Sequence, residues 1–438
     1  MASAPLQTPS PVEIVTAPQA DETMGPQSTS TAARPPDGGL QAWTQVVGSF
    51  FMILASWGTL NTFGVFQTYY QETFLSSYSP ADISWIGTVQ GFLLIVVGVL
   101  SGPFYDLGYL KLLIFIGTAL IVLGLLTASV AYNYYSIFLS IGVAIGLGSG
   151  CLFVPSIAIV STYFTTKRPL ATGITSSGGS IGGVIFPVIF RRLLDTVGYG
   201  WACRALGLIL GGLLVIAFFI SKPFGPPAKA KRRLIEPRAI RDPSFLLFSV
   251  ALFFTFTGIY VPFFYVSEYA QNKVGISDQL AFYLLAVQNA GSVFGRIIPS
   301  MLAVSAGSLP VLLWSLLATA VLAFAWPTTT NLAGVIVLGI LYGFFSGAVV
   351  SLPPAALVAL SPDLSVVGSR LGMSFSFAGL GLLIGNPIAG VIVSKSRGYL
   401  YQGLFVSATV LVGFVLMMIA EIAHKRKSKR EQDNDSTN

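Results

Sequence analysis

Apolar residues run along this chain in long unbroken stretches, not in the spaced pattern of a soluble helix or strand. Twelve stretches have roughly the 17 to 25 residues that let an α-helix cross a bilayer with its backbone hydrogen bonds made internally. We therefore predict an all-α membrane protein with twelve transmembrane helices. The expected spans are Trp43 to Tyr69, Ile83 to Leu100, Leu110 to Ala131, Tyr135 to Tyr163, Pro169 to Phe190, Arg204 to Ile220, Ser244 to Tyr269, Leu280 to Leu302, Leu309 to Trp326, Leu332 to Leu352, Gly368 to Val393 and Gln402 to Ala423.

Polar segments divide the chain into parts. Residues 1–36 are rich in Pro, Ser, Thr, Ala and Gln, and residues 424–438 are polar, so both tails are expected to be disordered. The longest loop between strongly apolar segments, residues 221–243, separates six spans from six. We predict a six-helix bundle over residues 37–220, a basic linker over 221–243 and a second bundle over 244–423, with the first helix as an uncleaved insertion signal.

The composition narrows the possible functions. Hydrophobic residues make up 54% of the 438 residues and charged residues 9%, about a third of the charged share of a soluble protein. The one histidine is His424 in the tail, and the sequence has no metal-ligand spacing or phosphate-binding loop, so neither an enzyme, a metal nor a cofactor is expected. Cys151 and Cys203 fall in or beside predicted helices, where small apolar fillers are favoured over a disulfide.

The net charge of +7 takes its meaning from where the basic residues lie. With the N-terminus in the cytoplasm, 17 of the 24 Lys and Arg residues fall on the inner side and 6 on the outer side, and Arg296 stands alone inside a helix. This bias follows the positive-inside rule, so we expect cytoplasmic termini and no nucleic-acid partner. The plasma membrane is the expected location, with an internal membrane as the alternative. The basic linker fits either a regulatory partner or attraction to anionic lipids. The sequon at Asn434 should stay unmodified.

An internal repeat relates the two halves. The fourth and tenth spans each carry a Ser-Gly pair followed by proline, and Gly179 and Pro187 of the fifth span have counterparts 200 positions later in Gly379 and Pro387. Repeats of the same orientation favour a transporter with its solute site between the halves near the membrane mid-plane. The alternative is that glycine and proline are simply common in membrane helices.

Two motifs resemble the signatures of a known family. The first is Pro36-Asp37-Gly38-Gly39, and the second runs from Tyr163 through Lys167 and Arg168 to Gly173. They are similar to the signatures of the monocarboxylate porter family of the major facilitator superfamily, in its fungal branch. The resemblance covers residues 36 to 423 and implies a carrier with the major facilitator fold. Fungal members include proteins assigned to riboflavin uptake and to export of secondary metabolites.

Elementary chemistry gives these motif residues roles of their own. Asp37 is expected to cap the helix that it precedes, because a carboxylate there can accept unpaired backbone N–H groups and complement the helix dipole. Gly38 and Gly39 would allow the tight entry. Lys167 and Arg168 fit two interpretations equally, as ion-pair partners between the bundles or as anchors on the cytoplasmic side.

Two further features concern movement between the bundles. The segment containing Asp106 resembles the cytoplasmic loop motif of the superfamily, in which the aspartate latches the halves, although Leu107 stands where a basic residue commonly follows. An ordinary loop cap is the alternative role for Asp106. Gly173 and Gly179 are expected to let helices approach closely at a moving interface.

Arg296 is the most informative residue. An arginine at the centre of a membrane helix costs about 2.5 to 3.5 kcal/mol and is by default functional. Gln288, Ser292 and Arg296 are spaced at i, i+4 and i+8 with Asn289 alongside, which predicts a polar stripe. The resemblance implies that this arginine holds a substrate carboxylate, and a planar guanidinium suits that task. The alternative is an arginine that snorkels to the membrane surface.

Departures from the family pattern suggest a different cargo. Animal members couple a proton with a lysine and an aspartate at the positions of Asn61 and Ser292, neither of which titrates near neutral pH. Tyr260 and Tyr342 predict a less charged, more aromatic cavity, or else ordinary packing. The leading hypothesis is a secondary transporter for an organic acid, vitamin or secondary metabolite. Proton-coupled monocarboxylate uptake is the alternative, followed by a channel or receptor.

Overall fold

The computed structural model describes residues 36–224, 236–361, 364–396 and 398–437, and every regular element in these ranges is helical, as predicted. The first tail and the linker residues Lys229, Lys231, Arg232 and Arg233 lie outside the described residues. The elements are α1 Gly39–Glu72, α2 Pro80–Asp106, α3 Leu110–Ala128, α4 Tyr134–Ile137, η1 Phe138–Ile145, α5 Gly146–Tyr163, α6 Arg168–Ile220, η2 Ala239–Arg241, α7 Pro243–Ile259, α8 Val261–Tyr269, η3 Ala270–Val274, α9 Asp278–Ala306, α10 Ser308–Ala325, η4 Trp326–Thr328, α11 Leu332–Ser351, α12 Pro353–Leu360, α13 Leu364–Ser396 and α14 Leu400–Thr437.

The described helices supply twelve membrane spans. Ten segments are long and apolar enough to cross a bilayer. One of them, α6, has 53 residues, and its backbone leaves the helical region at Gly198, so it provides two spans instead of one. The polar-striped α9, with 29 residues, adds the twelfth. A straight helix of 53 residues would be about 80 Å long, far more than the roughly 30 Å hydrocarbon core.

Local sequence explains where several spans begin and bend. At the start of α2, the Ser79 hydroxyl accepts a hydrogen bond from the Asp82 N–H at 3.2 Å, and the Asp82 carboxylate accepts one from the Ser79 N–H at 3.1 Å, a reciprocal cap. The seventh span is interrupted at Tyr260, just before Pro262, so α7 and α8 follow each other with a break. It then ends in the π-helical turn η3.

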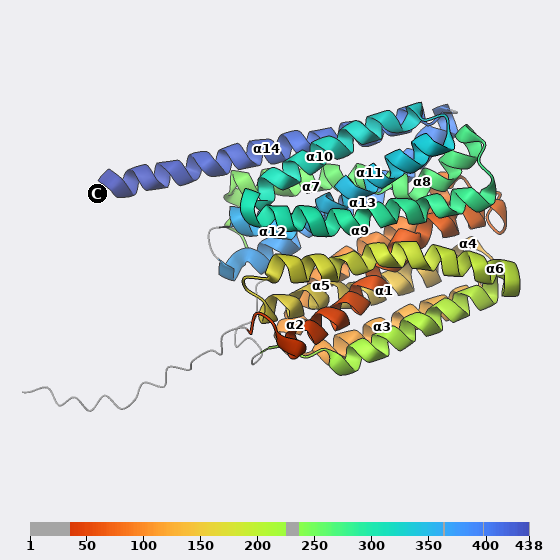
Figure 1. Ribbon diagram of the computed structural model, residues 1–438, viewed down its shortest axis with the longest axis horizontal. Coiled ribbons are helices and arrows are strands. Elements are labelled where there is room, and N and C mark those ends of the chain that lie inside the picture. Colours follow the sequence, from red (N-terminus) through yellow and green to blue (C-terminus); the bar gives the residue numbers. More distant parts are fainter. Residues whose placement is uncertain (1–35, 225–235, 362–363, 397, 438) are drawn as a thin grey trace, which may run out of the picture. The chain divides into compact units, whose positions relative to one another are not determined.

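Two groups of helices lie side by side in Figure 1, α1 to α6 in one and α7 to α14 in the other. They meet where α6 contacts α9, α2 contacts α13 and α1 contacts α8, and we call this junction the seam. Inside the second group, α9 and α11 pack backbone against backbone. A Cβ atom added to Gly295 or Gly343 would overlap a backbone carbonyl of the neighbouring helix, Phe344 or Gln288. The predicted bundle boundaries stay a prediction.

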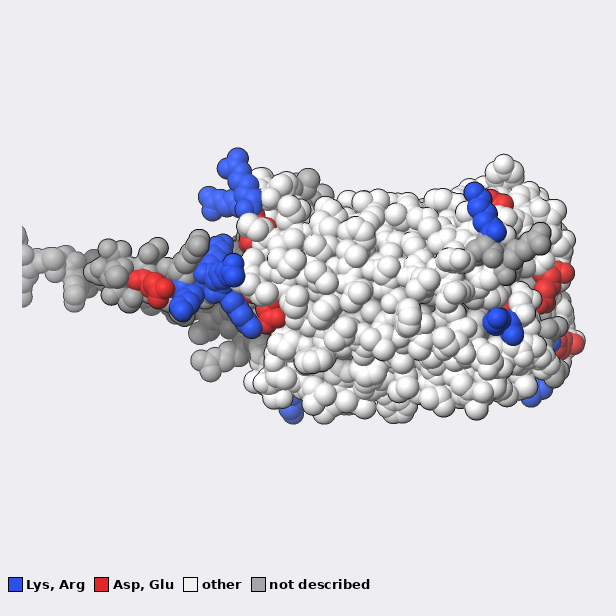
Figure 2. All heavy atoms as spheres, turned by 90° about the horizontal axis from the view of Figure 1, so that it is seen from above, with Lys and Arg blue, Asp and Glu red and all other residues white. Residues whose placement is uncertain are grey.

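The outer surface matches a bilayer. Figure 2 shows an uncharged band between two ends that carry the charged side chains, with many Lys and Arg where α14 leaves the body. Large apolar side chains are exposed along the helices, among them Phe115, Trp314 and Phe324. Exposed apolar surface of this extent is stable only against lipid tails. The chain is therefore a multi-pass membrane protein.

The C-terminal tail differs from the expectation of disorder. The last helix α14 continues through residues 424–437 to Thr437. Lys425 forms an ion pair with Glu421 one turn earlier, at 2.6 Å. Lys, Arg and Glu have high helix propensity, so a polar segment that follows an already formed helix can extend it without any tertiary contact.

Candidate substrate site

The side chain of Arg296 lies inside the protein, on α9 at the seam, and 4% of the residue surface is exposed. One terminal N–H donates to the backbone carbonyl of Ser176 on α6, at 3.0 Å. The hydroxyl of Tyr260 is a close neighbour of the guanidinium. Among the described residues no carboxylate pairs with Arg296, and its Nε–H has no hydrogen-bond partner. Burying a cation without a counterion lowers the stability of the folded protein, which indicates that Arg296 has a functional role.

The predicted polar stripe of α9 is buried along its whole length. The Ser180 hydroxyl of α6 donates to the Ser292 hydroxyl at 3.0 Å across the seam. Asn289 donates to the carbonyl of Leu285 in its own helix, which leaves its Oδ1 without a partner among the described residues. Both polar atoms of the Gln288 side chain also lack partners there. Buried polar groups are normally satisfied, so these atoms are available to a ligand or to water.

Asn61 lies on α1 and is separated from the polar stripe of α9 by α6. Its side-chain amide donates to the carbonyl of Gly179 on α6, at 3.0 Å. A Cβ atom added to Gly179 would lie 2.7 Å from the Trp57 Cβ and 3.7 Å from an Arg296 nitrogen. The absence of a side chain at Gly179 therefore lets α1 and α9 approach the same point of α6, which brings Asn61, Trp57 and Arg296 into one neighbourhood.

The aromatic residues of the site differ in what their polar atoms do. The ring of Tyr260 stacks on Trp57 with centroids 6.1 Å apart and an interplanar angle of 27°, and its hydroxyl lies beside the Arg296 guanidinium without a well-formed hydrogen bond in the described chain. The Tyr342 hydroxyl instead donates to the Ile259 carbonyl at 2.9 Å, inside the second group. The Tyr260 hydroxyl thus faces Arg296 at the seam, whereas the hydroxyl of Tyr342 bonds α11 to α7 inside the second group.

Trp57 is a site residue that the sequence analysis missed. It lies one turn before Asn61 on the first helix, a spacing that would have placed it on the same face. The serines at 176 and 180 were missed as well, because serine is too common in the Gly- and Ser-rich fifth span to stand out.

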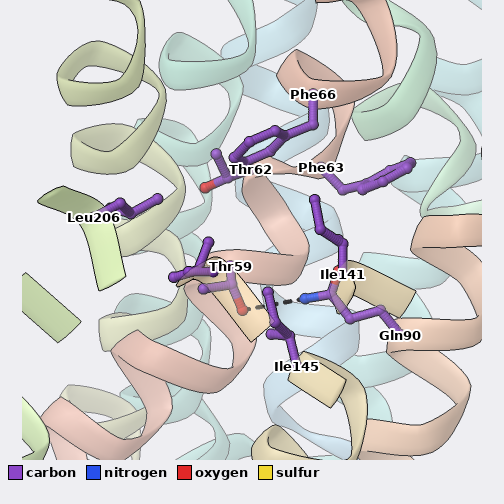
Figure 3. A pocket seen from close by; sticks show the side chains of 9 residues that line it. Thr59, Thr62, Phe63, Phe66, Gln90, Ile141, Ile145 and Leu206 are labelled. Carbon is purple, nitrogen blue, oxygen red and sulfur yellow. Dashed lines mark hydrogen bonds between the residues drawn. The ribbon is translucent and has the colours of Figure 1, made fainter. Parts of the chain in front are cut away.

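A small cavity lies elsewhere, inside the first group (Figure 3). Thr59, Thr62, Phe63 and Gln90 are among the residues that line it, and the Gln90 amide donates to the Thr59 hydroxyl at 3.2 Å. Its free volume of about 10 Å³ is at the lower limit for one water molecule. It is therefore too small for an organic solute, and it is not part of the Arg296 site.

The two signature motifs contact each other. The Asp37 carboxylate accepts hydrogen bonds from the backbone N–H groups of Thr165 and Thr166, at 2.6 and 3.0 Å, and from both of their hydroxyls. The hydroxyl of Thr165, followed by the N–H of Thr166, holds the pKa of Asp37 well below its ordinary value of 3.8. Asp37 itself has a left-handed backbone with φ 53°, and Gly39 follows with φ 84°.

This contact corrects the expected role of Asp37. The carboxylate does not cap α1, which begins with Gly38 as N-cap and has no side-chain hydrogen bond there. It binds the turn that leads into α6 instead. The left-handed backbone of Asp37 and the hydrogen bond from its N–H to the Tyr163 carbonyl, at 3.0 Å, hold the carboxylate against the second motif. Arg168 donates to the carbonyls of Phe164 and Ser161 and so caps the end of α5.

The other motif residues lie on the seam or near the ends of helices. A Cβ atom on Gly173 would be 3.5 Å from the Arg296 carbonyl oxygen, an ordinary contact distance. Asp106 is the last residue of α2, beside the loop to α3. The backbone N–H of Lys167 approaches the Asp37 carboxylate at 3.4 Å.

A buried ion-pair network near the linker was not predicted. Arg370, counted in the sequence as an ordinary inner basic residue, pairs with Glu236 at 2.8 Å and with Asp242 at 3.0 Å. All three side chains are largely buried. Asp242 also caps α7 by accepting a hydrogen bond from the Ser244 N–H. The network connects Glu236, at the described end of the linker, to the N-terminal part of α13.

Comparison with known proteins identifies relatives along most of the chain. The family described as Major Facilitator Superfamily matches residues 46–331. The chain is 38% identical over 410 residues to the MFS-type transporter dbaD of Emericella nidulans, covering 91% of this chain and 92% of that protein. It is 35% identical over 388 residues to the Aspyridones efflux protein apdF of the same species, covering 88% and 79%.

Two further comparisons agree with these. The Agnestins efflux protein AgnL12 of Paecilomyces divaricatus is 36% identical over 400 residues, covering 91% of this chain and 92% of that protein. Among solved structures, the fucose:proton symporter FucP of E. coli superimposes with a TM-score of 0.62 over 86% of this chain and 98% of that one, at 16% sequence identity. At that identity the similarity speaks for the fold alone.

Proposed function

The chain belongs to the major facilitator superfamily and is a secondary transporter, and we propose that it exports a small organic anion with a partly apolar body from the cytoplasm. The major facilitator fold predicted from the sequence is confirmed. The names of two relatives describe them as efflux proteins for aspyridones and agnestins, which supports export of a secondary metabolite here. The two touching signature motifs support the fungal branch of the monocarboxylate porter family.

The buried Arg296 carries this proposal. It lies at the seam without a carboxylate partner in the described residues and with one N–H group unused. An anion bound there would supply the missing counterion, and a planar guanidinium can hold both oxygens of a carboxylate or of a similar acid. On the same stripe Gln288 offers an unpaired side-chain amide, and Asn289 offers an unpaired acceptor oxygen.

The seam is tightly packed at one end, which supports alternating access. There, a Cβ atom on Gly64 would overlap the Phe263 carbonyl, and a Cβ on Gly390 would lie 2.8 Å from Ala81. A solute that leaves by this end requires these contacts to separate.

The charge distribution supports the proposed topology. The end that carries the basic residues of α14 would face the cytoplasm, as the positive-inside rule requires. Both termini and the linker would then be cytoplasmic, and the plasma membrane is the location consistent with export. Lipids would then contact the exposed apolar band.

Proton-coupled uptake is the second candidate, and one observation favours it. Glu268 of α8 is largely buried in the outer half of its span, and its Oε2 has no well-formed hydrogen bond among the described residues, although Gln71 of α1 lies beside it. Its Oε1 accepts from the Tyr399 hydroxyl at 3.3 Å. A carboxylate between two moving groups can bind a proton in one state and lose it in another.

Metabolite profiling of a deletion strain tests the direction of transport. The strain should retain an organic acid inside the cell that the wild type releases, and reintroducing the gene should restore release. Loss of uptake of an external acid in the deletion strain would instead establish import.

Substitutions at Arg296 test recognition in the same strain. At equal surface amounts, Arg296→Gln should reduce release to a few per cent and Arg296→Lys to an intermediate rate, because a point charge replaces a two-pronged donor. Arg204→Gln is the matched control, since Arg204 lies away from the seam and donates to Ser129. Full activity of Arg296→Gln would refute the proposal.

A further inference from the structure

Four buried aromatic side chains meet at the middle of the seam. Trp57 of α1 and Phe153 of α5 belong to the first group, and Tyr260 and Phe375 of α13 belong to the second. Trp57 contacts Phe153 edge-on with ring centroids 5.3 Å apart, and Phe153 lies 6.2 Å from Phe375. Together with the Trp57–Tyr260 stack, these contacts cross the seam twice. We call these four residues the aromatic cluster.

The aromatic cluster is directly connected to the buried cation. Trp57 and Arg296 approach the same point of α6 because residue 179 has no side chain. Tyr260 lies between them, with its ring on Trp57 and its hydroxyl beside the guanidinium. The Tyr260 hydroxyl and the Arg296 Nε–H are both buried, and neither makes a well-formed hydrogen bond in the described chain, although the hydroxyl and the guanidinium lie beside each other. The polar end of a ligand would thus find two incompletely hydrogen-bonded groups beside two aromatic faces.

The geometry of the stack selects for ligand shape. Trp57 and Tyr260 present stacked faces, inclined by 27°, from opposite groups, so opening the seam separates one face from the other. A flat ring needs about 7 Å between two such faces, twice the van der Waals separation of about 3.5 Å. Flat conjugated rings regain the stacking contact that opening removes, whereas a puckered saturated ring of the same size cannot lie flat against both faces.

We propose that Trp57 and Tyr260 hold the planar conjugated ring of the cargo while Arg296 holds its acidic group, so that the substrate class is planar aromatic organic acids. This inference rests on the proposed function, because it places the cargo at the Arg296 site. It adds Trp57 to the residues that bind the cargo, and it requires the cargo to be flat, which Arg296 alone does not.

Binding to purified protein in nanodiscs tests the inference with three probes. 2-Naphthoate carries both features, decahydro-2-naphthoate keeps the acid but has a saturated ring, and 2-naphthylmethanol keeps the ring but has no charge. Isothermal titration should show 2-naphthoate binding at least tenfold more tightly than either of the others. Equal affinities for the flat and the saturated acid, or no binding of 2-naphthoate at millimolar concentration, would overturn the inference.

Variants separate the two features. Trp57→Leu should remove the preference for the flat acid while keeping the preference for acid over alcohol, and Arg296→Gln should do the reverse. Trp57→Phe should keep most of the preference for the flat ring. That result would show that the preference lost in Trp57→Leu depends on an aromatic side chain and is not a result of misfolding. Trp201→Leu is the matched control, because Trp201 is exposed and lies outside the aromatic cluster.

Transport distinguishes the two proposals. If Trp57→Leu retains the ring preference while Arg296→Gln abolishes release in cells, the inference fails and the proposed function stands. If Arg296→Gln leaves release unchanged, the proposed function itself fails.

Discussion

Replacing Gly64 by alanine tests whether the seam must close during transport. A Cβ atom on Gly64 would overlap the backbone carbonyl oxygen of Phe263, which belongs to the other group of helices. A backbone carbonyl cannot rotate away as a flexible side chain would. The added methyl group therefore forces α1 and α8 apart, and it disfavours the closed state specifically.

The size of the effect follows from packing. Overfilling a well-packed contact typically costs about 1 to 3 kcal/mol. The higher helix propensity of alanine, worth about 1 kcal/mol, benefits open and closed states alike and cancels from their ratio. At about 1.4 kcal/mol per factor of ten, the open fraction of this end should rise about 5- to 140-fold. Gly173→Ala is the control, because a Cβ there meets only ordinary contacts.

Cysteine labelling measures this change. Leu285 is buried beside Gly64, so Leu285→Cys in a chain without Cys151 and Cys203 reports opening. In nanodiscs, a water-soluble maleimide should label the cysteine at a rate that rises 5-fold or more with Gly64→Ala and stays unchanged with Gly173→Ala. Equal labelling rates in the two variants, both folded, would refute the argument that backbone contact at Gly64 holds this end closed.

Three further predictions concern the ends of the helices. Asp37→Asn should lower the melting temperature equally at pH 7 and pH 5. The pKa of Asp37 is depressed in the folded protein, so its ionised form contributes full stability above pH 3.8, the ordinary pKa, and this contribution is lost only as the pH falls through the lower folded value. A difference in melting temperature between wild type and variant that vanishes by pH 5 would contradict this. Arg370→Gln should lower the free energy of unfolding by roughly 3 to 5 kcal/mol, because it leaves two buried carboxylates unpaired, and Arg370→Lys should lower it by less. Equal losses in the two variants, measured by thermal unfolding, would show that the charge of residue 370 does not stabilise the protein. Epitope tags in the 221–243 loop and after Lys429 should be reached by antibody only after the plasma membrane is permeabilised, and staining of intact cells would contradict the topology.

The fold was accessible from the sequence because each span carries its own signal. Continuous apolar runs fix a membrane helix whatever its neighbours are, so the predicted spans agree with the helices within several residues. The exceptions depend on local chemistry that hydropathy ignores. Gly198 interrupts a helix that otherwise runs through the loop between two spans, and the polar tail after His424 remains helical.

The candidate site was accessible only in part. Arg296 stood out because a charge in an apolar run is rare, and its stripe followed from helical spacing. Contacts between segments that are distant along the chain produce no recognisable pattern in the sequence. Nothing in the sequence says that Asp37 binds Thr165 and Thr166, or that Arg370 pairs with Glu236, because these partners meet only after the helices pack. Trp57 was hidden among many apolar residues, whose lipid-facing or seam-facing position depends on helix rotation.

The glycine contacts inside the second group have a consequence for how such carriers diversify. Gly295 and Gly343 lock α9 to α11 backbone against backbone, so the frame of this group does not depend on which large side chains project into the seam. The faces of this group at the middle of the seam, by contrast, meet the first group through side chains such as Tyr260 and Phe375. Cargo preference can therefore change through substitutions on those faces while the scaffold keeps its shape, which gives one architecture room to serve chemically different solutes.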